Sequence, residues 1–213
     1  TQKVRVQPGE SVAVLGAGVT GLSVGQRVGV EPRHLVGCGH CRWCRRGDYH
    51  LCPTRGRVGD KRVGSTGFAE YSLEPAFNVY PLPDHVDMQD ASILDVYACA
   101  VHALRIAPVM PASTVVVQGA GAIGLTALEL YKIGGAKQVI VCDVVDNALA
   151  MATRLGADAV VNSAKVNPVE AVMDLTNGEG ADVVVEAVGG MAPTFVDDVT
   201  MAARGGRVLV IGM

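Results

Sequence analysis

The sequence predicts an α/β protein in which a β-rich, turn-rich segment precedes a parallel sheet covered by helices on both faces. In residues 1–90 short β-branched runs are broken by Gly and Pro, whereas later apolar runs alternate with segments of helical spacing. Glycine makes up 26 of the 213 residues, above the usual share of about 7%. Frequent glycines are typical of tight turns and close backbone approaches.

Composition narrows the classes of protein. Hydrophobic residues make up 49% and charged residues 18% of the chain, and Gly or charges interrupt every apolar run before a membrane span of about 18 residues is reached. Thr1 begins without an apolar signal segment, so we expect a soluble, cytoplasmic protein. The net charge is −3, but residues 33–62 hold eight bases and two acids, which makes that window +6.

The segment up to residue 90 has the pattern of an all-β domain. We expect a helix over Met88–Ala107, which ends there because Pro108 and Pro111 follow. This helix would link the segment to residues 91–213. The strands that we expect in this segment are short β-branched runs, at Ser11–Leu15, Gln26–Val30, Ala69–Leu73 and Asn78–Leu82.

The remainder predicts alternating strands and helices. Leu125, Leu128 and Tyr131 mark one helical face, and Gly134 and Gly135 end that helix. Near-continuous apolar strands are typical of a parallel sheet that is buried on both faces. The five expected strands are Thr114–Gln118, Gln138–Asp143, Ala159–Val161, Asp182–Ala187 and Arg207–Ile211.

Four cysteines, Cys38, Cys41, Cys44 and Cys52, follow the pattern C-x2-C-x2-C-x7-C. Four thiolates so close in sequence can enclose one Zn²⁺ ion in a tetrahedron, with no open position for a substrate, so we expect a structural zinc site. An iron–sulfur cluster is the rival, but the ferredoxin run has a spacing of x3 before its fourth cysteine.

The bases around these cysteines also raise the possibility of a zinc knuckle that binds nucleic acid. Only Trp43 and Tyr49 are interleaved aromatic residues, and four thiolates with one Zn²⁺ leave two negative charges for the bases to compensate. We therefore expect no nucleic-acid partner.

A glycine fingerprint follows the expected strand Thr114–Gln118, with Gly119, Gly121 and Gly124 as its glycines. A helix opens near Ala122, where backbone N–H groups can contact a pyrophosphate. Asp143 ends the next strand, nineteen residues after Gly124. A carboxylate there can accept both ribose hydroxyls and repel a 2′-phosphate, so the pattern predicts a dinucleotide site that prefers NAD to NADP.

A second glycine pattern, at residues 16–21, lacks this context. Leu22–Glu31 has no helical face, and no strand ending in an acid follows at the required distance. We expect a loop between two strands here.

Together these features resemble the medium-chain, zinc-containing alcohol dehydrogenases, and within them the polyol and L-threonine dehydrogenase branch. Further likenesses are Gly67-Phe68-Ala69-Glu70-Tyr71, Leu155-Gly156-Ala157-Asp158 and Gly205-Gly206-Arg207. The resemblance implies a GroES-like β-rich domain over residues 1–90, with its structural zinc lobe at 33–62. It implies a Rossmann NAD-binding domain, a doubly wound parallel sheet, over 91–213, both domains being partial. The implied reaction transfers a hydride between an alcohol or polyol and NAD.

The resemblance also implies roles for single residues. Asp95 matches the third ligand of a catalytic zinc, and Cys99, one helical turn later, would lie by the nicotinamide. Ala148 stands where many relatives carry a basic residue near the adenosine. The remaining implied cofactor contacts are Ile123, Val188, Ile211, Gly212 and Met213.

Two departures from the family pattern leave alternatives open. The place of the family's Gly-His-Glu reads Pro8-Gly9-Glu10-Ser11, and no cysteine precedes Cys38, so two ligands of the catalytic zinc are lacking. The resemblance implies a homodimer or homotetramer, but the sequence ends at the fifth strand, whereas relatives continue with a sixth that is used in dimerisation. We expect either a fragment trimmed at both ends or a short form, and a catalytically silent NAD(H)-binding relative is the alternative to an enzyme.

Overall fold

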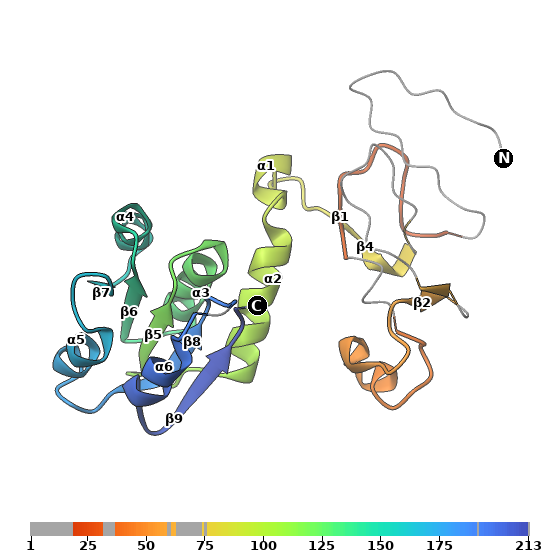
Figure 1. The fold of residues 1–213 in the computed structure, drawn as a ribbon. Coiled ribbons are helices and arrows are strands. Elements are labelled where there is room, and N and C mark those ends of the chain that lie inside the picture. The colour runs from red at the N-terminus through yellow and green to blue at the C-terminus, as the bar shows by residue number, and fades with distance from the viewer. Residues whose placement is uncertain are drawn as a thin grey trace. The chain divides into compact units, whose positions relative to one another are not determined.

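The computed structural model describes residues 19–31, 37–58, 61–62, 74, 76–190 and 192–212. The chain divides into two compact units between Ser92 and Ile93. Each unit has its own secondary structure and is described by itself below (Figure 1).

The described part of the first unit consists of short strands and turns. Strand β1 (Val28–Val30) pairs antiparallel with β4 (Val79–Pro81), and β2 (Arg57–Val58) pairs antiparallel with β3 (Lys61–Arg62). Three short 3-10 helices lie between them, namely η2 (Cys44–Arg46), η3 (Tyr49–Leu51) and η4 (Ala76–Asn78).

Two of the four strands expected in this unit can be compared with the structure. Strand β1 lies inside the run Gln26–Val30 and β4 inside Asn78–Leu82, whereas Ser11–Leu15 and Ala69–Leu73 lie outside the described residues. Residues 19–27 contain no helix or strand, as expected for the second glycine pattern, whose first three residues also lie outside the described part.

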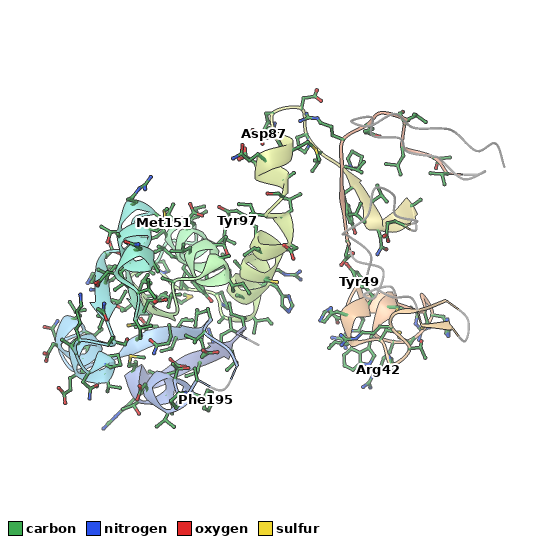
Figure 2. The ribbon with its side chains drawn as sticks, turned by 45° about the horizontal axis from the view of Figure 1, so that its top comes forward. Arg42, Tyr49, Asp87, Tyr97, Met151 and Phe195 are labelled. Carbon is green, nitrogen blue, oxygen red and sulfur yellow. The ribbon has the colours of Figure 1, made fainter. Side chains whose placement is uncertain are left out.

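The expected single helix over Met88–Ala107 is wrong, because the structure has two helices. Helix α1 (Met88–Ala91) begins where the Asp87 side chain, labelled in Figure 2, accepts the N–H of Asp90 at 2.7 Å. The Ser92 hydroxyl donates to the carbonyl oxygen of Gln89 at 2.6 Å, and the chain leaves helical geometry at Ile93. Helix α2 (Leu94–Ile106) then starts anew as the first element of the second unit.

The second unit contains a five-stranded, all-parallel sheet with the strand order β7-β6-β5-β8-β9 (Figure 1). The predicted α/β fold class is therefore confirmed. The strands are β5 (Thr114–Gln118), β6 (Gln138–Asp143), β7 (Ala159–Asn162), β8 (Ala181–Glu186) and β9 (Ala202–Val210). The helices after α2 are α3 (Ala122–Ile133), α4 (Asp146–Arg154), α5 (Pro168–Leu175) and α6 (Phe195–Met201).

Helices cover both faces of this sheet because successive strand residues point to opposite sides. Val115 and Val117 of β5 pack into one core cluster with Leu128 and Tyr131 of α3. Val116 lies in a second cluster on the other face, which includes residues of α5 and α6. The valines at the centre of the sheet are fully buried, as the near-continuous apolar strands predicted.

Strand β9 is longer than expected. It starts at Ala202 rather than Arg207, and its pairing with β8 is irregular between Ala181 and Val183. From Arg207 to Val210 the strand pairs with β8 as expected, and before that Ala202 pairs with Ala181. Residues 203–206, which include Gly205 with a φ of 80°, have no partner in β8 and form an irregular bulge between the two paired stretches. None of the described helices combines the length and the apolar character that a bilayer span requires.

Candidate functional site

Four cysteine sulfurs converge at one point of the first unit. The Sγ atoms of Cys38, Cys41, Cys44 and Cys52 all lie within 4.8 Å of one another, and all four cysteines are free. Such a set of thiols has the donor chemistry of a closed, structural zinc site. No other group of three or more metal-binding side chains converges in this way in the described part of the chain.

Backbone N–H groups point at these sulfurs. The N–H of Cys38 donates to Cys52 Sγ at 3.4 Å, that of Cys41 donates to Cys38 Sγ at 3.4 Å, and that of Cys44 donates to Cys41 Sγ at 3.5 Å. Because a hydrogen bond to a thiolate favours the charged form, these donors suit sulfurs that share their negative charge with a cation.

Hydrogen bonds and burial shift the pKa values of three of these thiols. The Thr54 hydroxyl and the Cys38 N–H lower the pKa of Cys52 to about 6. The N–H groups of His40 and Cys41 lower the pKa of Cys38. Burial raises the pKa of Cys44 to about 11. These contacts favour the thiolate, the form that binds metal, at Cys38 and Cys52.

Tyr49 joins the cysteine lobe, by which we mean the described part of residues 33–62, to strand β1. Its hydroxyl donates to the two carboxylate oxygens of Glu31 at 2.8 and 2.9 Å, and Glu31 directly follows β1. Burial and the negative charge of Glu31 raise the pKa of Tyr49 far above its usual value. Figure 2 labels Tyr49 and Arg42 of this lobe.

Two arginines of this lobe contact neighbouring side chains of the lobe itself. The Arg42 guanidinium lies 4.3 Å from the centre of the Trp43 ring, and Arg46 lies 5.8 Å from it. Arg46 also pairs with Asp48 at 3.7 Å. The single tryptophan, which could stack on a nucleic-acid base, is thus engaged by two neighbouring arginines.

The first glycine fingerprint lies in the expected strand-to-helix turn. Strand β5 ends at Gln118, and α3 begins at Ala122 with Gly121 as its N-cap and no side chain capping its N–H groups. Gly119 has a φ of 97°, a value that few residues other than glycine adopt. A Cβ on Gly124 would overlap the Gly119 carbonyl oxygen, so only glycine allows the helix to pack this closely on the turn.

Asp143 lies beside this turn, at the end of β6. One carboxylate oxygen accepts the N–H of Ala120 at 2.6 Å, and the other accepts the N–H of Val145 at 2.8 Å. Each oxygen of a carboxylate can accept two hydrogen bonds, so Asp143 has capacity left for two hydroxyl donors. A half-buried acid thus contacts the glycine turn that the dinucleotide pattern predicts.

Two family models match this chain, one in each unit. Residues 9–84 match the alcohol dehydrogenase GroES-like domain, and residues 122–213 match the zinc-binding dehydrogenase domain. The chain belongs to the medium-chain zinc alcohol dehydrogenase family.

Known relatives in this dehydrogenase family align with nearly the whole chain. L-threonine 3-dehydrogenase of Xanthomonas campestris is 41% identical over 202 residues, which is 95% of this chain and 57% of the relative. Alcohol dehydrogenase TADH from Thermus sp. ATN1 has a TM-score of 0.83 and 34% identity, covering 94% of this chain and 58% of that one. A zinc-binding dehydrogenase from Sinorhizobium meliloti 1021, bound to NADP, has a TM-score of 0.84 and 30% identity, covering 95% and 58%.

These figures also give the extent of the match. The chain spans about 57% of the length of the curated dehydrogenases that it matches.

Three of the family-implied cofactor residues lie near one another at the carboxyl edge of the sheet. Val188 follows β8, and Ile211 and Gly212 follow β9. The N–H groups of Ile211 and Gly212 donate to the Glu186 carbonyl oxygen at 2.9 and 3.0 Å. Met213 lies outside the described residues. Ile123, in the first turn of α3, follows the glycine turn directly.

Asp95 and Cys99 are exposed and lie one turn apart in α2. Asp95 does not converge with two other metal-binding side chains among the described residues. Its role as a ligand of a catalytic zinc stays a prediction.

Sequence reasoning missed one residue of this edge, Glu186. Its side chain is only 4% exposed, and its carboxylate accepts hydrogen bonds from the loop that follows β8. The available signal was an acid that directly ends a buried apolar strand, the same position that Asp143 occupies in β6.

Proposed function

We propose that this chain carries the structural zinc site and the NAD site of a zinc-dependent dehydrogenase that acts on an alcohol or polyol. The observation that carries the proposal is the contact of Asp143 with the turn Gly119–Gly121 at the start of α3. When bound, NAD would accept a hydride from the alcohol carbon. The part of this chain is to bind and orient that cofactor, and the cysteine lobe would keep the first unit folded.

The residues present fit an NAD molecule in several respects. The glycine turn leaves room for a pyrophosphate at the uncapped N-terminus of α3. Asp143 offers its remaining acceptor positions to the ribose hydroxyls and would repel a phosphate at the 2′ position. The contacts assigned to this site are Gly119, Gly121, Ala122, Ile123, Gly124, Asp143, Val188, Ile211, Gly212 and Met213, with Cys99 near the nicotinamide.

We also propose that Asp95 is a ligand of the catalytic zinc in the active dehydrogenase and that the protein acts in the cytoplasm. The relatives of this chain include an L-threonine 3-dehydrogenase, so the substrate that fits this proposal best is a small alcohol that carries other polar groups.

The test is a fluorescence titration of the chain with NADH and with NADPH. We expect at least about tenfold tighter binding of NADH, equal to about 1.4 kcal/mol, because a charge clash with the 2′-phosphate exceeds that amount. Asp143→Ala should narrow or reverse the ratio. Asp174→Ala, which removes an exposed carboxylate from α5, is the matched control and should leave the ratio unchanged.

Two other outcomes would change the proposal. An unchanged ratio in Asp143→Ala would mean that this acid does not contact the ribose. Binding of NADH without alcohol-dependent NADH formation by the full gene product would favour a catalytically silent NAD(H)-binding protein.

A further inference from the structure

Glu186 is a buried carboxylate that joins two loops at the carboxyl edge of the sheet. One of its oxygens, Oε1, accepts the N–H of Val188 at 2.9 Å and the N–H of Gly189 at 3.1 Å. The same oxygen accepts the Thr194 hydroxyl at 3.2 Å. Three donors from the segment between β8 and α6 therefore meet on a single atom.

The second loop, after β9, is held by the main chain of the same residue. Its carbonyl oxygen accepts the N–H groups of Ile211 and Gly212. A Cβ on Gly212 would stand 2.7 Å from Glu186 Oε2 and would overlap the backbone N of Gly189. The two loops are thus in direct contact, with Glu186 between them.

These loops also reach the glycine turn. A Cβ on Gly119 would lie 3.0 Å from Val188 Cγ2 and 3.1 Å from the Val188 backbone N. The N–H of Ala187 donates to the Gln118 carbonyl oxygen at 2.8 Å. The backbone of Val188 is therefore fixed by the glycine turn on one side and by the Glu186 carboxylate on the other.

A buried carboxylate is costly unless it receives several hydrogen bonds, and charge-assisted bonds are the stronger ones. An apolar residue at this position would fill the same space at no such cost, but it would leave the N–H groups of Val188 and Gly189 without their acceptor. The carboxylate therefore sets the conformation of the loop rather than the packing of the core.

We propose that Glu186 is a positioning residue for the nicotinamide half of the dinucleotide. It holds the loops of Val188 and Gly212 in the conformation that receives the nicotinamide, whereas Asp143 and the glycine turn hold the adenosine half. This inference rests on the proposed function, because it assumes that a dinucleotide binds at this edge.

The experiment compares two ligands on the 213-residue chain, NADH and ADP-ribose, which lacks the nicotinamide. In Glu186→Met the carboxylate is replaced by an unbranched apolar side chain, and we expect NADH affinity to fall at least about tenfold while ADP-ribose affinity changes less than about twofold, because only the loops lose their order. The fluorescence of bound NADH should also shift towards that of free NADH, since the ring is less well enclosed.

Two milder variants keep the test independent of a folding defect. Glu186→Gln retains an oxygen acceptor for the three donors and should keep NADH affinity within about threefold of the unmodified chain. Thr194→Val removes one donor at constant volume and should weaken NADH by about twofold to threefold, again without affecting ADP-ribose. Asp182→Asn is the matched control, because its exposed carboxylate accepts the Thr114 N–H at the opposite end of β8.

Equal losses for NADH and ADP-ribose in Glu186→Met and Thr194→Val, or no loss for either ligand in Glu186→Met, would overturn the role of Glu186. If the unmodified chain bound neither ligand, the proposed cofactor site itself would be wrong. Binding of ADP-ribose by the unmodified chain therefore separates a failure of the inference from a failure of the proposed function.

Discussion

Replacing Asp198 by Asn should stabilise the protein above neutral pH. Asp198 lies in α6 and is fully buried, and neither of its carboxylate oxygens has a hydrogen-bond partner among the described residues. Burial raises its pKa to about 7, and the negative charges of Glu186 and Asp197 contribute to this shift. Burial raises the pKa of the Cys142 thiol to about 12, and the negative charge of Asp198 contributes to that shift.

The sign and size follow from the two pKa values. In the unfolded chain this group has its ordinary pKa of 3.8, against about 7 in the folded protein, so the folded state holds the proton more tightly. The contribution of Asp198 to the free energy of unfolding is therefore greatest at low pH, falls as the pH rises from about 4 to about 7, and then levels off. At 1.36 kcal/mol per unit the full effect is about 4 kcal/mol, and entry of water around the charged form should reduce it to about 2 kcal/mol.

The assay is urea unfolding of the original chain and of Asp198→Asn between pH 5 and pH 8.5, followed by circular dichroism. Other titrating groups cancel in the difference between the free energies of unfolding of the two proteins. This difference should grow in favour of the variant by about 1–2 kcal/mol as the pH rises from 5 to 8.5. Asp174→Asn, which neutralises an exposed carboxylate of α5 that does not contribute to the shift, serves as the control and should show a much flatter difference. Parallel stability curves for Asp198→Asn and the original chain would refute the raised pKa.

Three further predictions concern the two sites. Cys41→Ser should lose one bound Zn²⁺ per chain by elemental analysis and disorder the cysteine lobe while the second unit keeps its unfolding midpoint; Cys99→Ser should keep the metal, and iron in the purified protein would contradict the assignment. Gly124→Ala should cost about 1–3 kcal/mol of stability by overlap with Gly119, whereas Gly121→Ala, whose Cβ would meet nothing within 4 Å, should cost less than about 0.5 kcal/mol in the same unfolding assay. In an active protein that contains this chain, Asp95→Ala should depress turnover far more than NADH binding. Turnover equal to that of the unmodified protein would mean that Asp95 is a surface carboxylate and no zinc ligand.

The central strands of the second unit could be predicted because their side chains are buried on both faces of the sheet. Val115, Val116 and Val117 face a core whichever way they point, so a continuous apolar run identifies a central strand without knowledge of the fold. The glycine turn was equally accessible, because its strand, helix and acid lie within one short stretch of sequence.

Features that depend on side-chain contacts or on burial were not accessible in this way. The break between α1 and α2 lies at Ser92 and Ile93, where the Ser92 hydroxyl caps α1 and Ile93 leaves helical geometry, and the apolar pattern does not mark either residue. In α6, Asp198 is fully buried, whereas Val196 and Val199 are 72% and 53% exposed, the reverse of the usual pattern. Phe195, labelled in Figure 2, is also exposed, at 53%. Sequence alone gives no reason to separate Asp198 from its neighbour Asp197.

The carboxyl edge of the sheet also shows why motifs far apart in the sequence meet. The N–H of Gly119 donates to the Cys142 carbonyl oxygen at 2.7 Å, and that of Ala187 donates to Gln118 at 2.8 Å. The hydrogen bonding of the parallel strands thus continues one residue past the strands and fixes where each loop begins.

Strand register therefore brings the loops together, and two carboxylates then set their conformation. Asp143 accepts the N–H of Ala120 in the glycine turn, and Glu186 accepts N–H groups in the loop after β8. Each acid ends its strand, β6 or β8, and these two strands flank β5 on either side. Because the two acids act on different loops, substitutions at one should change the affinity for one half of a dinucleotide and leave the other half bound.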